Sequence, residues 1–253
     1  MSMTIRGKYM NMKVMGRDPS ILSSLPDTKL FSNKNFDEMI QKYETVIIKP
    51  NAGGGGAGVM KVSRLPEGKY LVHKGAGKKV LSSKAAALRY LEGSTISRRH
   101  IVQQYIPLST IDGCPFDLRV MIQRKKGVPW TITGKLAKVA GTNHFITNVA
   151  RSRGYVLPAL SALTKSFSDK KAEAILKKLD RICLSAAKQL EIAYGFQTIG
   201  FDIAIDQKGN PWILESNSKP AISFFRKLQD KSLYRRMLEM APSKEYRKHF
   251  MII

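Results

Sequence analysis

The sequence predicts an α+β fold of antiparallel strand pairs and helices, and three patterns along its 253 residues support this. Residues 169–194 carry apolar side chains at helical spacing, which predicts one long amphipathic helix. Residues 195–220 contain two apolar stretches around a short turn at Lys208–Gly209–Asn210, which predicts a hairpin. Residues 45–65 contain two more apolar stretches around a glycine-rich loop, which predicts an extended hairpin.

The other elements follow from the same signals. The LPDT segment (25–28) predicts a turn, and residues 35–44 predict a short helix capped by Asn35. In chain order we then expect a hairpin at 69–82, a helix at 83–93, a strand at 100–108, two long strands around a turn at Lys126–Gly127 within 116–140, an irregular stretch at 146–155, and a basic helical segment from Ile222.

Charge is the most unusual feature of the composition. The formal net charge is +24, which indicates an anionic partner. No Asp or Glu occurs from Leu118 to Ser168, whereas that span holds nine basic residues: Arg119, Arg124, Lys125, Lys126, Lys135, Lys138, Arg151, Arg153 and Lys165. We expect part of the span to line an anion-binding cleft; the alternative is a solvated basic face.

The composition also bears on location. No apolar run approaches the roughly 20 residues that a membrane helix needs, and the first residues lack the apolar core of a signal peptide. We therefore expect a cytoplasmic protein with no membrane partner. Cys114 and Cys183 have no metal-ligand or redox spacing, and Cys183 falls on the apolar helix face, which predicts a buried thiol.

The glycine-rich loop is a candidate phosphate site. Gly53, Gly54, Gly55, Gly56 and Gly58 lie within six residues, just after Lys49 at the end of a predicted strand. No helix start follows the loop and no GxxxxGK[ST] pattern is present, which excludes the Walker and Rossmann motifs. A mobile flap remains, whose backbone N–H groups could approach phosphates closely because no Cβ intervenes. The alternative is a flexible surface hairpin.

The hairpin at 195–220 carries a candidate magnesium site. Glu215 and Asn217 are two residues apart in one strand, so their side chains share a face. Asp202 can lie opposite them in the antiparallel partner strand. Three oxygen ligands of this kind suit Mg²⁺. The alternative is that these polar residues only end the strand.

The order of these features resembles the ATP-grasp superfamily. The matching segments cover nearly the whole chain from about Gly7: LPDT, VIIKPNAGGGGAGV, IVQQYIPL, FDLRVMIQRKKGVPWTITGKLAKVAG, ITNVARSRG and GFDIAIDQKGNPWILESNSKP. More narrowly, it is similar to the YheC/YheD branch of spore-coat-associated proteins, with RimK-like ligases as more distant relatives. The resemblance implies one ATP-grasp domain over 1–253, with two α+β subdomains that clasp ATP. The smaller would span about 30–105 and hold the flap; the larger would span about 106–253 with part of 1–29.

The resemblance also implies roles for individual residues. Lys49 would hold the ATP phosphates with a second lysine, for which Lys8 is the candidate and Lys13 the reserve. The base would meet the hinge formed by Gln103, Gln104, Tyr105 and Ile106. Arg119 would serve the acceptor and phosphate site, and Lys138 stands where RimK-like relatives often have arginine. Asn148 matches the asparagine of the family's Thr-Asn (TN) element. Asp202, Glu215 and Asn217 would be the magnesium ligands.

These roles predict a carboxylate–amine ligase that uses ATP and Mg²⁺ and forms an acylphosphate intermediate. The basic span favours an anionic acceptor such as an acidic peptide or protein tail, and the second substrate would be an amine donor such as an amino acid. Fewer than fifty residues precede Lys49, too few for the substrate domain of many ATP-grasp enzymes. We therefore expect a partner protein or a large acceptor to complete the site.

Two alternatives stay open. One is a kinase on the same scaffold that phosphorylates a hydroxyl group. The other is a non-enzymatic binder of an anionic polymer or nucleic acid. Nucleic acid is less favoured because the basic stretches lack interleaved aromatic residues on which bases could stack.

Overall fold

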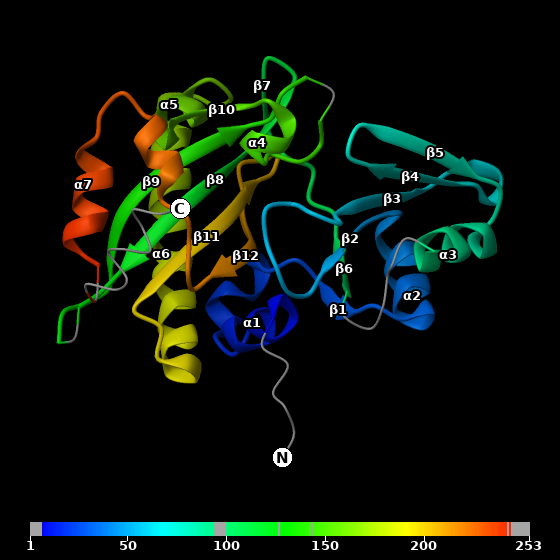
Figure 1. Cartoon of the computed structure of the whole chain (residues 1–253), viewed down its shortest axis with the longest axis horizontal. Helices are drawn as coiled ribbons and strands as arrows, with labels where there is room; N and C mark the ends of the chain where they lie inside the picture. Colours follow the sequence, from blue (N-terminus) through cyan, green and yellow to red (C-terminus); the bar gives the residue numbers. More distant parts are fainter. Residues whose placement is uncertain (1–6, 94–99, 126, 143, 242, 244–253) are drawn as a thin grey trace.

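The computed structural model describes residues 7–93, 100–125, 127–142, 144–241 and 243, and arranges their strands in two antiparallel sheets (Figure 1). The first sheet has the order β1-β6-β2-β3-β4-β5. Its strands are β1 (Thr28–Leu30), β2 (Thr45–Pro50), β3 (Met60–Arg64), β4 (Tyr70–Lys74), β5 (Gly77–Leu81) and β6 (His100–Gln104). The glycine-rich loop joins neighbouring strands β2 and β3, which confirms the extended hairpin.

The second sheet has the order β10-β9-β8-β11-β12, with β7 paired to β8. Its strands are β7 (Thr110–Ile111), β8 (Cys114–Gln123), β9 (Thr131–Val139), β10 (Tyr155–Pro158), β11 (Thr198–Ile205) and β12 (Pro211–Asn217). The predicted hairpins of β8 with β9 and of β11 with β12 are therefore confirmed. The two sheets confirm the α+β class, whereas the subdomain limits near residues 30 and 105 stay a prediction.

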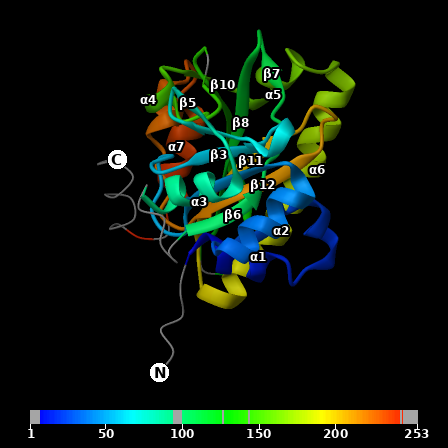
Figure 2. The same ribbon diagram turned by 90° about the vertical axis from the view of Figure 1, so that its right-hand side faces the viewer.

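Helices cover both sheets (Figures 1 and 2). They are α1 (Lys8–Met15), α2 (Asn33–Tyr43), α3 (Lys84–Gly93), α4 (Val149–Ser152), α5 (Ala159–Thr164), α6 (Asp169–Tyr194) and α7 (Ser232–Glu239), with short 3₁₀ turns η1 (Pro19–Ser24), η2 (Pro66–Gly68) and η3 (Ser223–Lys227). Helices α2 and α3 pack on the first sheet, and α6 packs on the second. None of the helices in the described ranges has both the length and the apolar character of a membrane span.

The cores explain why these elements form. On α6 the predicted apolar positions Ile175, Leu179, Ile182, Cys183, Ala186 and Leu190 are buried against β8, β11 and β12. The opposite face of the second sheet is covered by η3 and α7, which pack on Met121 and Leu136. Gly134 in β9 permits this contact, because a Cβ there would lie 2.1 Å from Met237 and 2.9 Å from Phe225. Burying both faces of the sheet in this way fixes the strands that carry the site.

Some local predictions were wrong. Helix α2 begins at Asn33, and its cap is Ser32, whose hydroxyl accepts a hydrogen bond from the Asn35 backbone N–H at 3.1 Å. The LPDT segment runs into β1, because Thr28 pairs with Gln103 in β6. The stretch 146–155, expected to be irregular, contains α4 and leads into β10, which gains its order by pairing with β9. The first part of the predicted basic helical tail is present as η3 and α7. Residues 242 and 244–253 of that tail, and Lys126 of the predicted turn, lie outside the described residues.

Candidate active site

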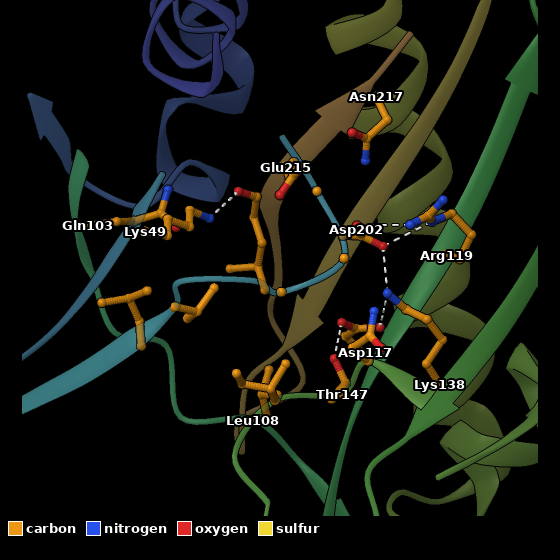
Figure 3. A pocket seen from close by; sticks show the side chains of 18 of the residues that line it. Lys49, Gln103, Leu108, Asp117, Arg119, Lys138, Thr147, Asp202, Glu215 and Asn217 are labelled. Carbon is orange, nitrogen blue, oxygen red and sulfur yellow. Dashed lines mark hydrogen bonds and ion pairs between the residues drawn. The ribbon is translucent and has the colours of Figure 1, made fainter. Parts of the chain in front are cut away.

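A cavity of about 420 Å³ lies between the two sheets. Its walls come from β2 and the glycine loop on one side and from β8, β9, β11 and β12 on the other. Most of the predicted site residues line it: Lys49, Gly54, Gly55, Gly56, Gln103, Gln104, Tyr105, Ile106, Arg119, Lys138, Asn148, Asp202, Glu215 and Asn217. Residues more than 160 positions apart in the sequence therefore meet in one cavity (Figure 3).

The loop between β2 and β3, residues 51–59, forms a largely exposed flap over the cavity. Gly53, Gly55, Gly56 and Gly58 have positive φ angles, between 70° and 84°. A Cβ on Gly55 would meet no atom within 4 Å, so the backbone conformation rather than crowding requires glycine there. Gly53 is the predicted flap glycine that lies outside the main cavity; it lines a second cavity beside it.

Two lysines approach the flap and the hairpin β11–β12. The Lys49 side chain is 8% exposed, and its Nζ donates to the Leu214 carbonyl at 3.1 Å (Figure 3). Burial lowers the pKa of Lys49 to about 8, a drop that the nearby Glu215 carboxylate limits. Lys8 Nζ donates to the Gly53 carbonyl at 2.6 Å and lies 3.7 Å from Glu215 Oε1. Lys13, the reserve candidate, is exposed and lies over the Tyr9 ring.

A buried ionic network joins three strands of the second sheet (Figure 3). Arg119 in β8 holds both oxygens of Asp202 in β11, with Nε–Oδ1 at 2.9 Å and Nη2–Oδ2 at 3.0 Å. Lys138 in β9 bridges the two acids, at 2.8 Å from Asp202 Oδ1 and 3.1 Å from Asp117 Oδ1. The Thr147 hydroxyl donates to the other oxygen of Asp117. The network thus ties the strands to the loop before α4.

The environment shifts the pKa values of the two acids of this network in opposite directions. Burial raises the pKa of Asp117, although the Lys138 ammonium opposes it. Burial also acts on Asp202, but Arg119 and Lys138 hold the pKa of that carboxyl well below its ordinary value. Asp202 is therefore an anion in the cavity wall, balanced by two fixed cations.

The predicted magnesium ligands lie together on the hairpin. Asp202 pairs directly with Glu215 across β11 and β12, and Asn217 lies two residues further along the same strand. Carboxylate and amide oxygens suit Mg²⁺, so the donor set fits this ion. Within the described ranges, no three His, Cys, Asp or Glu residues are grouped to hold a metal, since this set has two carboxylates and one amide. Asp202 is also occupied by its cations, which leaves Glu215 and Asn217 as the more accessible oxygens.

The hinge after β6 presents an apolar pocket. The Gln103 side chain donates to Thr28 Oγ1 at 2.9 Å, and Gln104 Oε1 accepts from the Asp27 backbone N–H at 3.3 Å. Both glutamine side chains are thus engaged by Asp27 and Thr28, at the start of β1. A base beside these glutamines would therefore contact the backbone and the apolar neighbours. Those neighbours include Ile47, Leu108, Ile146 and Leu214.

Sequence reasoning missed three polar residues of the cavity wall, namely Asp117, Thr147 and Lys219. Asp117 could have been found, since it lies two residues before Arg119 in one strand and shares its face. Thr147 precedes Asn148 in the TN element, but its link to Asp117 depends on how the loop folds back. Lys219 follows the predicted ligands by two residues and lies beyond the strand, where alternation no longer applies.

The acid-free span does not form one basic face. Of its basic residues that the structure describes, only Arg119 and Lys138 line the main cavity. Arg124 pairs with Glu191 at 2.5 Å and Lys135 with Asp180 at 2.8 Å, both acids lying on α6. Acids of α6 thus neutralise the charges of Arg124 and Lys135, which have no acidic neighbour within the span itself.

Comparison with known proteins identifies the family to which this chain belongs. The YheC/D-like ATP-grasp family matches residues 2–246. Endospore coat-associated protein YheD of Bacillus subtilis (strain 168) is 30% identical over 229 residues, covering 88% of this chain and 50% of its own. Probable tubulin polyglutamylase TTLL9 of Rattus norvegicus is 25% identical over 232 residues, covering 71% of this chain and 49% of its own. This chain therefore spans about half the length of the curated relatives that it matches.

A solved structure shares the fold. The ATP-grasp ligase PsnB, complexed with a phosphomimetic variant of its minimal precursor, Mg and ADP, has a TM-score of 0.51 and 17% identity, covering 91% of this chain and 56% of PsnB. At this identity the likeness concerns the fold alone. Together with the family match over nearly the whole sequence, it confirms the resemblance, and the chain belongs to the YheC/D-like ATP-grasp family.

Proposed function

We propose that the protein is an ATP-dependent carboxylate–amine ligase whose acceptor is an acidic peptide or protein tail. The observation that carries the proposal is the composition of the main cavity, where Lys49, Arg119 and Lys138 converge with the flap. The described residues that line it include no Ser, Cys or His that could serve as a protein nucleophile. Such a site suits direct transfer between two bound substrates, in which the protein positions groups and neutralises charge.

The proposed reaction has two steps. A carboxylate oxygen of the acceptor attacks the γ-phosphorus of ATP, the bond from that phosphorus to the bridging oxygen breaks, and ADP leaves. The amine nitrogen then attacks the acyl carbon, phosphate leaves, and the nitrogen loses a proton to give the amide. Both steps gather negative charge on oxygen atoms, which fixed cations stabilise.

The residues divide into four groups in this proposal. Lys49 and Lys8 hold the phosphates with the flap amides, and Arg119 and Lys138 face the transferred group. Asp202, Glu215 and Asn217 would hold Mg²⁺, which would neutralise phosphate charge when bound. The apolar neighbours of Gln103, Gln104, Tyr105 and Ile106 would take the base, and Asn148 lines the same cavity.

The relatives support a peptide acceptor. The solved structure of the ligase PsnB contains a variant of its minimal precursor, and TTLL9 is named as a probable tubulin polyglutamylase. The name of YheD supports a role connected with the endospore coat. The polyglutamylase name of TTLL9 favours an amino acid as the amine donor.

The test is ATP consumption in the presence of amino acids and acidic peptides, with mass spectrometry of the products. An amide adduct together with ADP and phosphate is the expected result. A phosphorylated acceptor with no amide would replace the ligase by a kinase on the same scaffold. ATP that is bound but never consumed with any acceptor would contradict an enzymatic function.

A further inference from the structure

Helix α1 begins against the base of the flap, and Lys8 is its first residue. The N–H groups of the first turn of a helix have no acceptor within the helix, so they need partners from elsewhere. The preceding residue, Gly7, has no side chain that could serve as a cap. Asn51, the first residue of the flap, supplies the partners instead. Its backbone carbonyl accepts from the Lys8 N–H at 2.9 Å, and its side-chain Oδ1 accepts from the Tyr9 N–H at 2.9 Å.

The contact between Asn51 and the start of α1 is buried and closely packed. Asn51 is only 4% exposed. A Cβ on Gly7 would lie 2.6 Å from Asn51 Nδ2 and 2.8 Å from Asn51 Cγ, so a larger residue at position 7 would displace the amide. Helix α1 and the β2–β3 loop lie next to each other in Figure 1, although 42 residues separate Tyr9 from Asn51. The flap therefore caps a helix that is distant from it in the sequence.

This cap lies between the two lysines that approach the flap. Lys8 Nζ donates to the carbonyl of Gly53, two residues after Asn51, and lies 3.7 Å from Glu215 Oε1. Lys49, two residues before Asn51, donates to the carbonyl of the residue that precedes Glu215 in β12. Both ammonium groups thus reach neighbouring residues of one strand. Asn51 follows one lysine in the chain and holds the backbone of the other.

The Lys8 ammonium lies at the boundary between the two cavities. Lys8 and Asn51 line the second cavity, whereas Lys49 lines the main one. Glu215 lines both, so the cation that faces it lies at their common wall. Asn51 does not line the main cavity, so any effect that it has on a nucleotide there must act through another residue.

The rest of α1 is held independently of the cap. Its second half is buried in the core of the second sheet through Met12, Val14 and Met15. Loss of the cap would therefore loosen the first turn, which carries Lys8, without releasing the helix. Because a lysine ammonium is a point charge on a flexible stem, the position of its backbone decides which atoms it can reach. A fixed first turn thus keeps the charge in place before a ligand arrives.

We infer that Asn51 is a positioning residue for nucleotide binding, which caps α1 from the base of the flap and so places the Lys8 ammonium for the phosphates. The inference rests on the proposed ligase function, from which it takes the role of Lys8. It requires that Asn51 acts on the nucleotide through Lys8. It also couples the flap to α1, because the base of the flap and the first turn of the helix share two hydrogen bonds.

The test is a double-mutant cycle on MgADP affinity, measured by isothermal titration calorimetry. Lys8→Met removes the ammonium and keeps most of the stem, and it should raise the dissociation constant about tenfold. Asn51→Ala removes the side-chain acceptor and should raise the dissociation constant about fivefold. In the Lys8→Met protein, Asn51→Ala should have no further effect, because the residue through which Asn51 acts has lost its charge.

Ser32→Ala is the matched control. The Ser32 hydroxyl caps α2 as the Asn51 amide caps α1, and Ser32 lines neither cavity. Its removal should therefore leave MgADP affinity unchanged. Amide exchange measured by NMR checks the cap itself: the Tyr9 amide should exchange faster in the Asn51→Ala protein and remain slow in the Asn51→Asp protein, which keeps an oxygen acceptor.

A second route to the same effect guards against misfolding of the Asn51→Ala protein. Gly7→Ala leaves Asn51 unchanged but crowds its amide, so it should weaken MgADP binding as Asn51→Ala does. In an Asn51→Ala background that still folds, Gly7→Ala should add nothing, because the crowded amide is gone.

The possible failures are separable. If Asn51→Ala weakens binding equally with and without the Lys8 ammonium, or if neither Asn51→Ala nor Gly7→Ala weakens it, the inference is wrong while the ligase proposal stands. If Lys8→Met leaves MgADP affinity unchanged, Lys8 does not meet the phosphates and the inference is again wrong. If the unsubstituted protein binds neither MgADP nor MgATP, the proposed ligase function itself is wrong.

Discussion

Arg119 and Asp202 face each other across strands β8 and β11, and the guanidinium holds both carboxylate oxygens at 2.9 and 3.0 Å. Both side chains are largely buried, and Lys138 shares the same carboxylate. Without Asp202, two cations would repel each other in the cavity wall. The pair therefore fixes the positions of the positive charges that the proposed reaction needs.

Replacing Arg119 by alanine should lower the free energy of unfolding by about 3 kcal/mol, because it leaves a buried carboxylate without its bidentate partner. Urea denaturation measures this. Arg124→Ala is the matched control, because the Arg124–Glu191 pair is more exposed and should cost less than about 1 kcal/mol. Equal costs for the two substitutions would show that the Arg119–Asp202 pair has no special role in stability.

Glu215→Gln should abolish most ATP turnover and leave the fold intact. The substitution preserves the side-chain shape and removes one negative charge from the proposed metal site. Turnover at saturating MgATP is the readout, with circular dichroism to check folding. Glu191→Gln, at an acid on α6 that does not line the main cavity, is the control, and a Glu215→Gln protein with normal turnover would refute the metal assignment.

Nucleotide affinity should fall as the pH rises through about 8, because Lys49 loses its charge there in the free protein. Above that pH the loss approaches about tenfold per unit if the charge is required. Calorimetric titration of ADP between neutral and alkaline pH measures it.

The stability contribution of Lys49 should change in the opposite direction. The unfolded chain binds more protons than the folded chain between pH 8 and the ordinary lysine pKa of 10.5, so this group makes unfolding less favourable as the pH rises.

The control for the affinity prediction is Lys49→Arg, which keeps its charge throughout this pH range. This substitution should remove the inflection in nucleotide affinity, and an unchanged affinity profile would show that Lys49 is not the group responsible.

Amide exchange across residues 52–58 should slow when ATP and Mg²⁺ are added. The flap is exposed and its glycines make local opening easy, so contacts with phosphates should increase its protection. At a nucleotide concentration of about 100 times Kd, protection should rise by up to about 100-fold. Residues 199–205 of β11 are the internal control, and no change in the flap would remove it from the phosphate site.

Acceptor binding should weaken more steeply with salt than ATP binding does. Exposed charges act over about 10 Å at 0.1 M salt, whereas the Lys49, Arg119 and Lys138 side chains are buried. Steady-state kinetics at low and moderate salt would separate the two, with Arg119→Ala lowering the rate constant. Removing Arg124, Lys125 and Lys126 together should mainly raise the acceptor concentration required. Identical, salt-insensitive behaviour of both proteins would show that the charges of this turn do not bind the acceptor.

Local patterns in the sequence predicted much of the fold and of the site. The period of two in a strand places Glu215 and Asn217 on one face, and the short turn at Gly209 brings Asp202 opposite them. Helical spacing likewise predicted the buried face of α6. These features depend on neighbours within about a dozen residues, where the chain geometry leaves few choices.

Only the tertiary structure decided which elements meet. Arg119 pairs with Asp202 from 83 residues away, and Lys8 reaches Gly53 from 45 residues away. The pairing of β8 with β11 is not encoded by spacing; it results from burying both faces of the second sheet under α6 and α7. The same packing set Asp202 among cations and formed the second cavity beside α1. A periodic pattern fixes the direction in which a side chain points, but its partner there is chosen by the competition of all apolar surfaces for burial.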